Sequence, residues 1–191
     1  MKVGTDGVLL GAWADITDAK KILDIGSGTG VIAIMLAQRT TQALTNSPEN
    51  VNVHAVEIET VAFEQSQENI INSPFASRVT VFNDSIQDFA KKSTFTYDLI
   101  VSNPPFFTGG TFSNNQDKNN VRHTVKLPHG DLLGATRQLL TKTGRFCVIL
   151  PLIEGLRFIE FARTSGFYCT KKHKCDRLNA NPLNVCCCNL N

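Results

Sequence analysis

Asp24-Ile25-Gly26-Ser27-Gly28-Thr29-Gly30 follows the short apolar run Ile22-Leu23 and opens a second apolar stretch at residues 31–37. This pattern predicts a strand, a glycine-rich turn and a helix, an arrangement in which glycines let the backbone approach a ligand closely. The spacing is G-x-G-x-G, which differs from the G-x-G-x-x-G of the dinucleotide-binding fingerprint. No Lys-Ser or Lys-Thr pair follows the last glycine, so the phosphate loop of nucleotide hydrolases is also excluded.

The acidic residue that opens this turn narrows the choice of ligand. Asp24 would repel a pyrophosphate, but it suits a cationic ligand such as the sulfonium amino acid of S-adenosylmethionine. A glycine turn alone is weak evidence, because glycine often only closes a strand–helix corner. The identification of a site therefore depends on the residues that end the neighbouring strands.

Carboxylates end the next two predicted strands. Residues 53–57 read as a strand that ends in Glu57, which is well placed to accept both hydroxyls of a ribose. Residues 79–84 read as the following strand and end in Asp84, whose carboxylate is available to an adenine amine. Either residue alone is more often a helix cap or a solvated turn residue. Ligands of open α/β sheets lie outside the carboxyl ends of the strands, so the succession of these residues predicts a cofactor site.

Asn103-Pro104-Pro105-Phe106 ends the fourth predicted strand, at residues 97–102. Two consecutive prolines fix φ and remove two backbone donors, so the strand cannot continue. The Asn103 side-chain oxygen and the Pro104 carbonyl can accept the two N–H bonds of a planar amino group and favour a pyramidal nitrogen, while Phe106 stacks on the ring. This arrangement suits a poorly nucleophilic amine, such as that of adenine or of an amide. The alternative is a simple strand-ending turn.

With these motifs the chain resembles the Rossmann-like S-adenosylmethionine-dependent methyltransferases that carry an Asn-Pro-Pro-aromatic motif, from residue 1 to about residue 185. Among these enzymes it resembles the bacterial tRNA(Val) adenine-N(6) methyltransferase family, which acts on the adenosine beside the anticodon. That similarity rests on residues 1–13 (MKVGTDGVLLGAW), on Asn69 with Ser73-Pro74, and on residues 102–106. The resemblance implies a Rossmann-like class I methyltransferase fold of the α/β class, with a doubly wound, mostly parallel sheet and a late antiparallel strand.

The resemblance also implies the cofactor, S-adenosylmethionine, and the residues around it. The expected cofactor-binding residues are Lys2, Thr5 and Asp6 at the methionine end, Asp24 at the start of the turn, Gly26, Gly28 and Gly30 under the cofactor, Glu57 at the ribose, Asp84 at the adenine, and Asn103. The residues expected to carry the chemistry are Asn103, Pro104, Pro105 and Phe106. No metal is expected.

The charge of the chain is unevenly distributed. The formal net charge is +2, but residues 1–117 carry 7 Lys and Arg against 13 Asp and Glu, and residues 118–191 carry 12 against 4. An acidic first part suits a cofactor site built from carboxylates, whereas a basic second part suits a polyanion. A solvated basic surface is the alternative explanation. The residues expected to contact substrate RNA are Arg122, Lys171, Lys172 and Lys174.

Length and composition indicate one globular domain over residues 1–191, because 42% of the residues are hydrophobic. No apolar run reaches membrane-spanning length and the N-terminus lacks a signal-peptide pattern, so we expect a cytoplasmic protein, most simply a monomer. The six cysteines form no Cys-x-x-Cys pair, which argues against a zinc ribbon or a redox dithiol. Relatives extend further at both ends, so we expect family segments to be missing before Lys2 and after residue 185.

Alternating apolar runs and amphipathic stretches predict the elements along the chain. Expected strands cover residues 21–25, 51–57, 78–83, 97–102, 145–150, 167–174 and 183–190. Expected helices cover residues 8–18, 28–39, 60–72, 129–141 and 153–164. Residues 107–120 are rich in Gly, Asn and Ser and are expected to form a loop that grips substrate.

Three functions are consistent with these features. The first is methylation of an adenine amine in tRNA, which the match at residues 2–13 favours. The second keeps the chemistry but changes the substrate to a guanine amine of ribosomal RNA or a glutamine amide of a protein; the basic second part disfavours a protein substrate. The third is a truncated domain that binds cofactor or RNA without turnover.

Overall fold

The structure is a computed structural model that describes residues 4–43, 51–105, 127–175 and 182–190. The strands are β1 (Lys21–Ile25), β2 (Asn52–Glu57), β3 (Val79–Asn83), β4 (Tyr97–Ser102), β5 (Leu140–Pro151), β6 (Phe167–Cys175) and β7 (Leu183–Leu190). The helices are α1 (Thr5–Trp13), α2 (Val31–Ala43), α3 (Thr60–Ile71), α4 (Ile86–Lys92), α5 (His129–Leu139) and α6 (Leu152–Thr164), with a short 3-10 helix, η2 (Ala76–Arg78).

One sheet of seven strands has the order β3-β2-β1-β4-β5-β7-β6. The pairs from β3 to β5 are all parallel, and β7 runs antiparallel to both β5 and β6. The predicted α/β fold, doubly wound and mostly parallel with a late antiparallel strand, is therefore confirmed. The strand order reverses between β1 and β4, which is where open α/β sheets bind their ligands.

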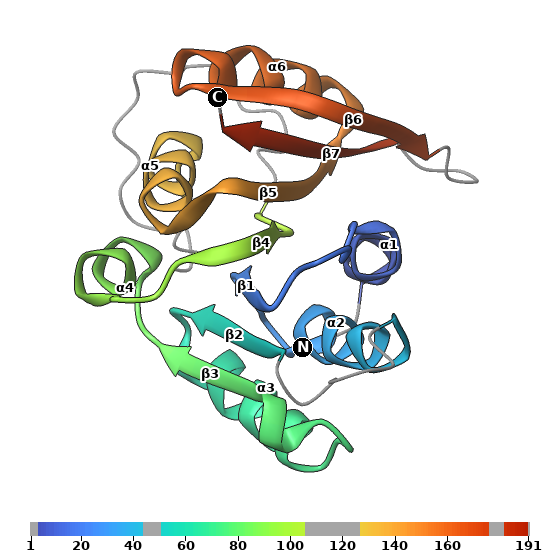
Figure 1. Cartoon of the computed structure of the whole chain (residues 1–191), viewed down its shortest axis with the longest axis vertical. Helices are drawn as coiled ribbons and strands as arrows, with labels where there is room; N and C mark the ends of the chain where they lie inside the picture. Colours follow the sequence, from blue (N-terminus) through green and yellow to red (C-terminus); the bar gives the residue numbers. More distant parts are fainter. Residues whose placement is uncertain (1–3, 44–50, 106–126, 176–181, 191) are drawn as a thin grey trace, which may run out of the picture.

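Helices cover both faces of the sheet (Figure 1). On one face, α1, α2 and α3 pack on a core that includes Leu10, Leu36 and Ile70. On the other face, α4, α5 and α6 pack on a second core that includes Phe89, Leu133 and Phe158. Both faces of β1, β4 and β5 are thus buried, which explains why these strands read as nearly continuous apolar runs.

Several predicted elements differ in their bounds, and one α-helix was missed. The helix predicted at residues 28–39 covers Val31–Ala43, and the first helix begins at Thr5 rather than at residue 8. The first helix ends at Trp13 rather than at residue 18, because the Arg39 guanidinium donates Nη1 to the carbonyls of Gly11 and Ala14 at 2.8 Å each and so satisfies the helix end. The strand predicted at residues 145–150 begins earlier, at Leu140. Helix α4, between β3 and β4, was not predicted.

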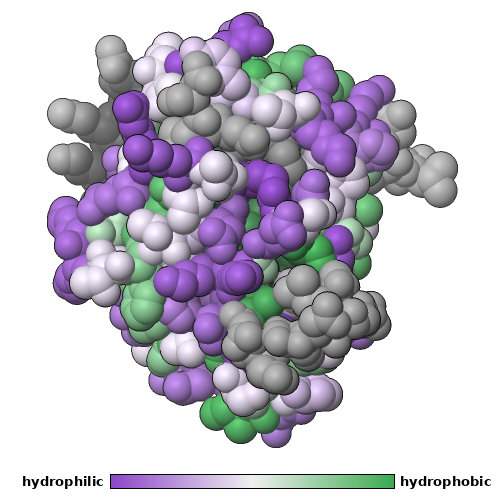
Figure 2. Space-filling view, in the orientation of Figure 1, coloured by the Kyte–Doolittle hydropathy of each residue, from purple (hydrophilic) through white to green (hydrophobic). Residues whose placement is uncertain are grey.

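The described surface is mainly hydrophilic on the face that Figure 2 shows. Hydrophobic side chains form separate small areas there, and strongly hydrophilic residues gather over the region where β6 lies in Figure 1. Among the described helices, none is both long enough and apolar enough to cross a membrane.

Candidate cofactor and active site

The glycine turn joins β1 to α2 at the carboxyl edge of the sheet. Gly26, Gly28 and Gly30 have φ angles of +73°, +54° and +77°, a region that side chains rarely adopt. A Cβ on Gly26 would have no neighbouring atom within 4 Å, whereas a Cβ on Gly30 would lie 3.3 Å from the Cβ of Ser66 in α3. Gly26 and Gly28 both line the cavity, and Gly30 allows close packing of α3.

Glu57 ties this turn to the end of β2. Its Oε2 accepts a hydrogen bond from the Gly28 N–H at 2.8 Å, and its Oε1 accepts one from the Glu59 N–H at 2.9 Å. The side chain is 7% exposed and lines the cavity. A carboxylate has about four acceptor positions, so the two bonds to backbone leave acceptor capacity for the hydroxyl groups of a ligand.

Asp84 lies beside Glu57 because the ends of β2 and β3 are joined. The Asp84 N–H donates to the Glu57 carbonyl at 3.2 Å, and the Asn83 side-chain amide donates to the same carbonyl at 2.9 Å. The Asp84 carboxylate accepts from the Ser85 N–H at 2.9 Å and from Lys92 Nζ at 3.0 Å. The structure thus brings together the two carboxylates that the sequence placed at successive strand ends.

Asp24 is fully buried at the end of β1, and its carboxylate makes no hydrogen bond of normal geometry with the described residues. Burial is the main reason why the pKa of Asp24 is raised to about 7; the Ala33 backbone N–H acts to lower this pKa, and the nearby Glu57 charge acts to raise it. Asp24 does not line the cavity itself. It is a buried acid whose charged form is opposed by burial and by the Glu57 charge, so a cation placed nearby would stabilise it.

The end of β4 carries the proline motif. The Ser102 hydroxyl donates to the Ile25 carbonyl at 2.9 Å and fixes the end of β4 against the end of β1. Asn103, Pro104 and Pro105 come next and line the cavity. The Asn103 Oδ1 is buried and makes no hydrogen bond within the described part of the chain. A buried acceptor without a partner is costly, so it indicates a donor supplied by a ligand.

These groups surround one cavity of about 640 Å³. It reaches from the glycine turn, past the ends of β2 and β3, to the proline motif. Its other walls come from residues that the sequence did not single out: Ile58 and Glu59 after β2, Ser85 to Asp88 and Lys91 at α4, and Leu127 before α5.

The α4 wall had a readable signal in the sequence. The Ser85 hydroxyl accepts from the Asp88 N–H at 3.0 Å, and the Asp88 carboxylate accepts from the same hydroxyl at 3.0 Å. A Ser or Thr followed three residues later by an acid at a helix start is a capping arrangement. Ser85-Ile86-Gln87-Asp88 therefore indicated a helix directly after the Asp84 strand end.

Several predicted site residues lie elsewhere. Thr5 and Asp6 form the first turn of α1; Thr5 is exposed, Asp6 is buried, and neither lines the cavity. Lys2, Phe106 and Arg122 lie outside the described residues. These five assignments stay predictions.

The three predicted RNA-binding lysines are exposed on β6, at the edge of the sheet. Side chains alternate along a strand, so Lys172 and Lys174 share one face and Lys171 points to the other. On the Lys171 face, the His173 ring lies 6.0 Å from the Trp13 ring of α1. The sequence cluster is therefore divided between the two faces of the sheet.

The turn, the two carboxylates and the proline motif at one sheet edge define a Rossmann-like methyltransferase architecture. The chain belongs to the methyltransferase small domain family, whose family model matches residues 4–150.

Among curated proteins, the chain is 45% identical over 168 residues to the tRNA1(Val) (adenine(37)-N6)-methyltransferase of Salmonella arizonae, covering 88% of this chain and 66% of that protein. It is 44% identical over 181 residues to the enzyme of the same name from Serratia proteamaculans, covering 95% of this chain and 65% of the relative. The predicted resemblance is therefore confirmed. The chain spans just under two thirds of the length of these relatives.

Solved structures share the fold at low sequence identity. TrmN from Thermus thermophilus superposes with a TM-score of 0.66 at 17% identity, covering 97% of this chain and 48% of that chain. TrmK of M. capricolum, in complex with S-adenosylhomocysteine, superposes with a TM-score of 0.64 at 11% identity, covering 100% of this chain and 70% of that chain.

Proposed function

We propose that this domain binds S-adenosylmethionine in the 640 Å³ cavity and transfers its methyl group to the exocyclic amine of an adenine in tRNA. The observation that carries the proposal is the unpartnered Asn103 Oδ1, which is buried beside two prolines in the same cavity as the glycine turn. When bound, the cofactor supplies an electrophilic methyl group on a sulfonium.

The donor set fits this cofactor. Gly26 and Gly28 line the cavity without a side chain, and their positive φ angles disfavour any residue that has one, so a ligand can lie against the backbone there. Glu57 has acceptor capacity for ribose hydroxyls, and Asp84 has it for an adenine amine. Asp24, buried and short of partners, suits the positively charged methionine end.

The proline motif would orient the target amine. The Asn103 Oδ1 and the Pro104 carbonyl accept its two N–H bonds, which turns the nitrogen lone pair away from the ring and toward the methyl donor. No strong base is needed, because the methylated amine loses its proton readily once formed. Catalysis then rests on positioning and on fixed acceptors, which hold the amine without reorganisation during the reaction. We assign the stacking of the target base to Phe106.

The RNA substrate is supported by charge and by the relatives' names. In the sheet register, Lys174 pairs with Asn184 and Asn184 with Leu150, while Ser102 pairs with Val148. Lys174 thus lies at the same carboxyl edge as the proline motif, three strand spacings away, or about 14 Å. When a base is drawn into the cavity, the phosphates on either side of it would lie within about this distance and so could contact Lys174. Bases in tRNA loops are single-stranded, so they can be drawn out at a modest unstacking cost.

The substrate is tested by incubating the chain with a labelled methyl donor and separate tRNA, ribosomal RNA and release-factor fractions, and then by nucleoside or amino-acid analysis. The proposal predicts N6-methyladenosine in the tRNA fraction. A labelled guanosine in ribosomal RNA, or a labelled glutamine in the release factor, would move the activity to another substrate class.

The RNA-binding surface is tested by salt dependence. Replacing Lys172 and Lys174 by alanine should reduce the slope of log affinity against log salt by about 0.7–0.9 for each phosphate that the variant no longer neutralises. The control is Lys142→Ala, which also removes an exposed lysine. Lys142 lies near the amino end of β5, where Leu140 pairs with Tyr97, and therefore on the side of the sheet opposite to the proline motif. Equal slopes for the two variants would exclude β6 as the RNA-binding surface.

A further inference from the structure

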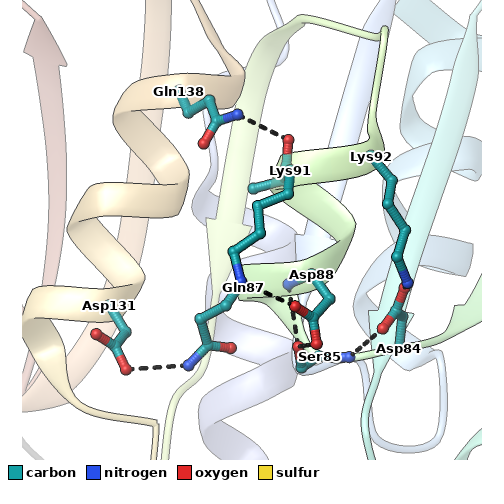
Figure 3. Close-up of polar contacts among 9 residues, drawn as sticks. Asp84, Ser85, Gln87, Asp88, Lys91, Lys92, Asp131 and Gln138 are labelled. Atoms are coloured by element: carbon teal, nitrogen blue, oxygen red, sulfur yellow. Dashed lines mark hydrogen bonds and ion pairs between the residues drawn. The ribbon is translucent and has the colours of Figure 1, made fainter.

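The Asp84 carboxylate is held on two sides at the rim of the cavity. Its Oδ1 accepts from the Ser85 N–H at 2.9 Å, and its Oδ2 is 3.0 Å from Lys92 Nζ (Figure 3). The Asp84 side chain is 27% exposed and the Lys92 side chain 71%. Lys92 lies outside the cavity lining, so it acts on a ligand only through Asp84.

The helix that carries Lys92 is anchored at both ends. Ser85 and Asp88 cap its N-terminus, and Gln87 donates to Asp131 of α5 at 3.0 Å. At the other end, Gln138 of α5 donates to the Ala90 carbonyl at 2.9 Å (Figure 3). Lys92 therefore extends toward Asp84 from a helix whose position is fixed by α5.

An exposed ion pair of this kind adds little to folding stability, because water screens both charges. Its effect on the carboxylate is more specific. The Lys92 ammonium favours the rotamer that turns Oδ2 toward α4, and it raises the cost of rotating the carboxylate away from the cavity rim. The pair therefore sets the direction in which the remaining acceptor positions of Asp84 point.

We propose that Lys92 is a positioning residue that directs Asp84 toward the 6-amino group of the cofactor adenine, and that the Lys92–Asp84 pair determines selectivity for adenine. This inference rests on the proposed cofactor and on the role of Asp84 in it. Adenine presents a donor at position 6, whereas hypoxanthine presents a carbonyl there. A fixed carboxylate accepts from the first and repels the second.

The test compares the affinities of S-adenosylhomocysteine and its deaminated counterpart, S-inosylhomocysteine, by calorimetry. The wild-type chain should prefer the adenine compound about tenfold or more, the range for a hydrogen bond to a charged group. Asp84→Asn should abolish that preference. Lys92→Met should reduce it by about two- to fivefold, which is the range for an exposed ion pair, and Lys92→Arg should restore it.

Lys142→Met is the control, because Lys142 is an exposed lysine of β5 that lies outside the cavity lining. Its preference for adenine should equal that of the wild type. Equal preferences in Lys92→Met and Lys142→Met, with Asp84→Asn still unselective, would overturn the role of Lys92 and leave that of Asp84 in place. Failure of the wild-type chain to bind either compound would overturn the proposed cofactor itself.

Discussion

Replacing Asp24 by asparagine removes a buried charge while keeping the shape of the side chain. In the folded protein burial raises the pKa of Asp24 from its ordinary value of 3.8 to about 7. When the pKa of a group is higher in the folded state than in the unfolded state, folding is favoured by the protonated form of that group. Its contribution to stability is fully present below the pKa of the unfolded state and is lost as the pH rises through the pKa of the folded state. The wild-type protein without ligand therefore loses stability from this group between about pH 4 and pH 7.

The size of the effect comes from the separation of the two pKa values. One pH unit corresponds to about 1.4 kcal/mol, so the ionised Asp24 costs the folded state about 4 kcal/mol at pH 8. Asparagine resembles the protonated acid and carries no such cost. The two proteins should have similar free energies of unfolding near pH 4, and the advantage of Asp24→Asn should grow to about 4 kcal/mol by pH 8.

Urea unfolding of both proteins at half-unit pH steps from 4 to 8 measures this difference directly. All other titrating groups are shared, so they cancel in the comparison. A difference that stays constant across the pH range would refute the argument. The same variant should bind S-adenosylmethionine more weakly, because the cation that stabilises the Asp24 charge would lose its partner; unchanged affinity would separate Asp24 from the cofactor site.

Three further outcomes are expected. Glu57→Ala should weaken S-adenosylhomocysteine binding by about 1.5–3 kcal/mol, measured by calorimetry, because a charged acceptor is removed; a smaller effect would place the ribose elsewhere. Gly26→Ala should cost about 1–2 kcal/mol for its positive φ, and Gly30→Ala should cost more in thermal unfolding, because its new methyl meets Ser66 at 3.3 Å. The His54 Nδ1 lies 2.8 Å from the Tyr97 hydroxyl, and burial and the Lys21 charge lower the pKa of this histidine. The contribution of neutral His54 to folding stability is therefore present above about pH 6.5 and is lost as the pH falls. Wild type should therefore lose more stability than His54→Gln between pH 7.5 and 5, and parallel curves would contradict this.

The sequence predicted the fold wherever an element carries its own signal. The glycine turn, the apolar strands and the acidic strand ends all depend on local residues, and each occurs close to its predicted place. Helix α4 was missed because it has only 7 residues, too few to show periodicity, although its capping residues Ser85 and Asp88 were visible. The end of α1 depends on Arg39, a residue distant in the sequence, so no local pattern could set it.

In the candidate site, too, the features set by local residues were predictable and those set by contacts between distant residues were not. Strand-end residues such as Glu57 and Asp84 were predictable, because parallel strands bring their carboxyl ends to one edge. The use of Glu57 to hold the Gly28 N–H depends on a turn geometry that a sequence does not reveal. The early start of β5 has a similar cause: Tyr97 pairs with Leu140 and Leu99 with Arg145, so the residues around Gly144 form a bulge inside one strand.

The most direct test of the central claim is methyl transfer by the Asn103→Ala variant to unmodified tRNA, with cofactor binding measured on the same sample. Asn103 Oδ1 is a buried acceptor in the cavity for which the described chain offers no donor. We predict that the wild-type chain forms N6-methyladenosine in tRNA, and that Asn103→Ala binds S-adenosylhomocysteine with nearly unchanged affinity while losing most turnover. Near-normal turnover by the variant would contradict the assigned role of the proline motif and, with it, the proposed mechanism.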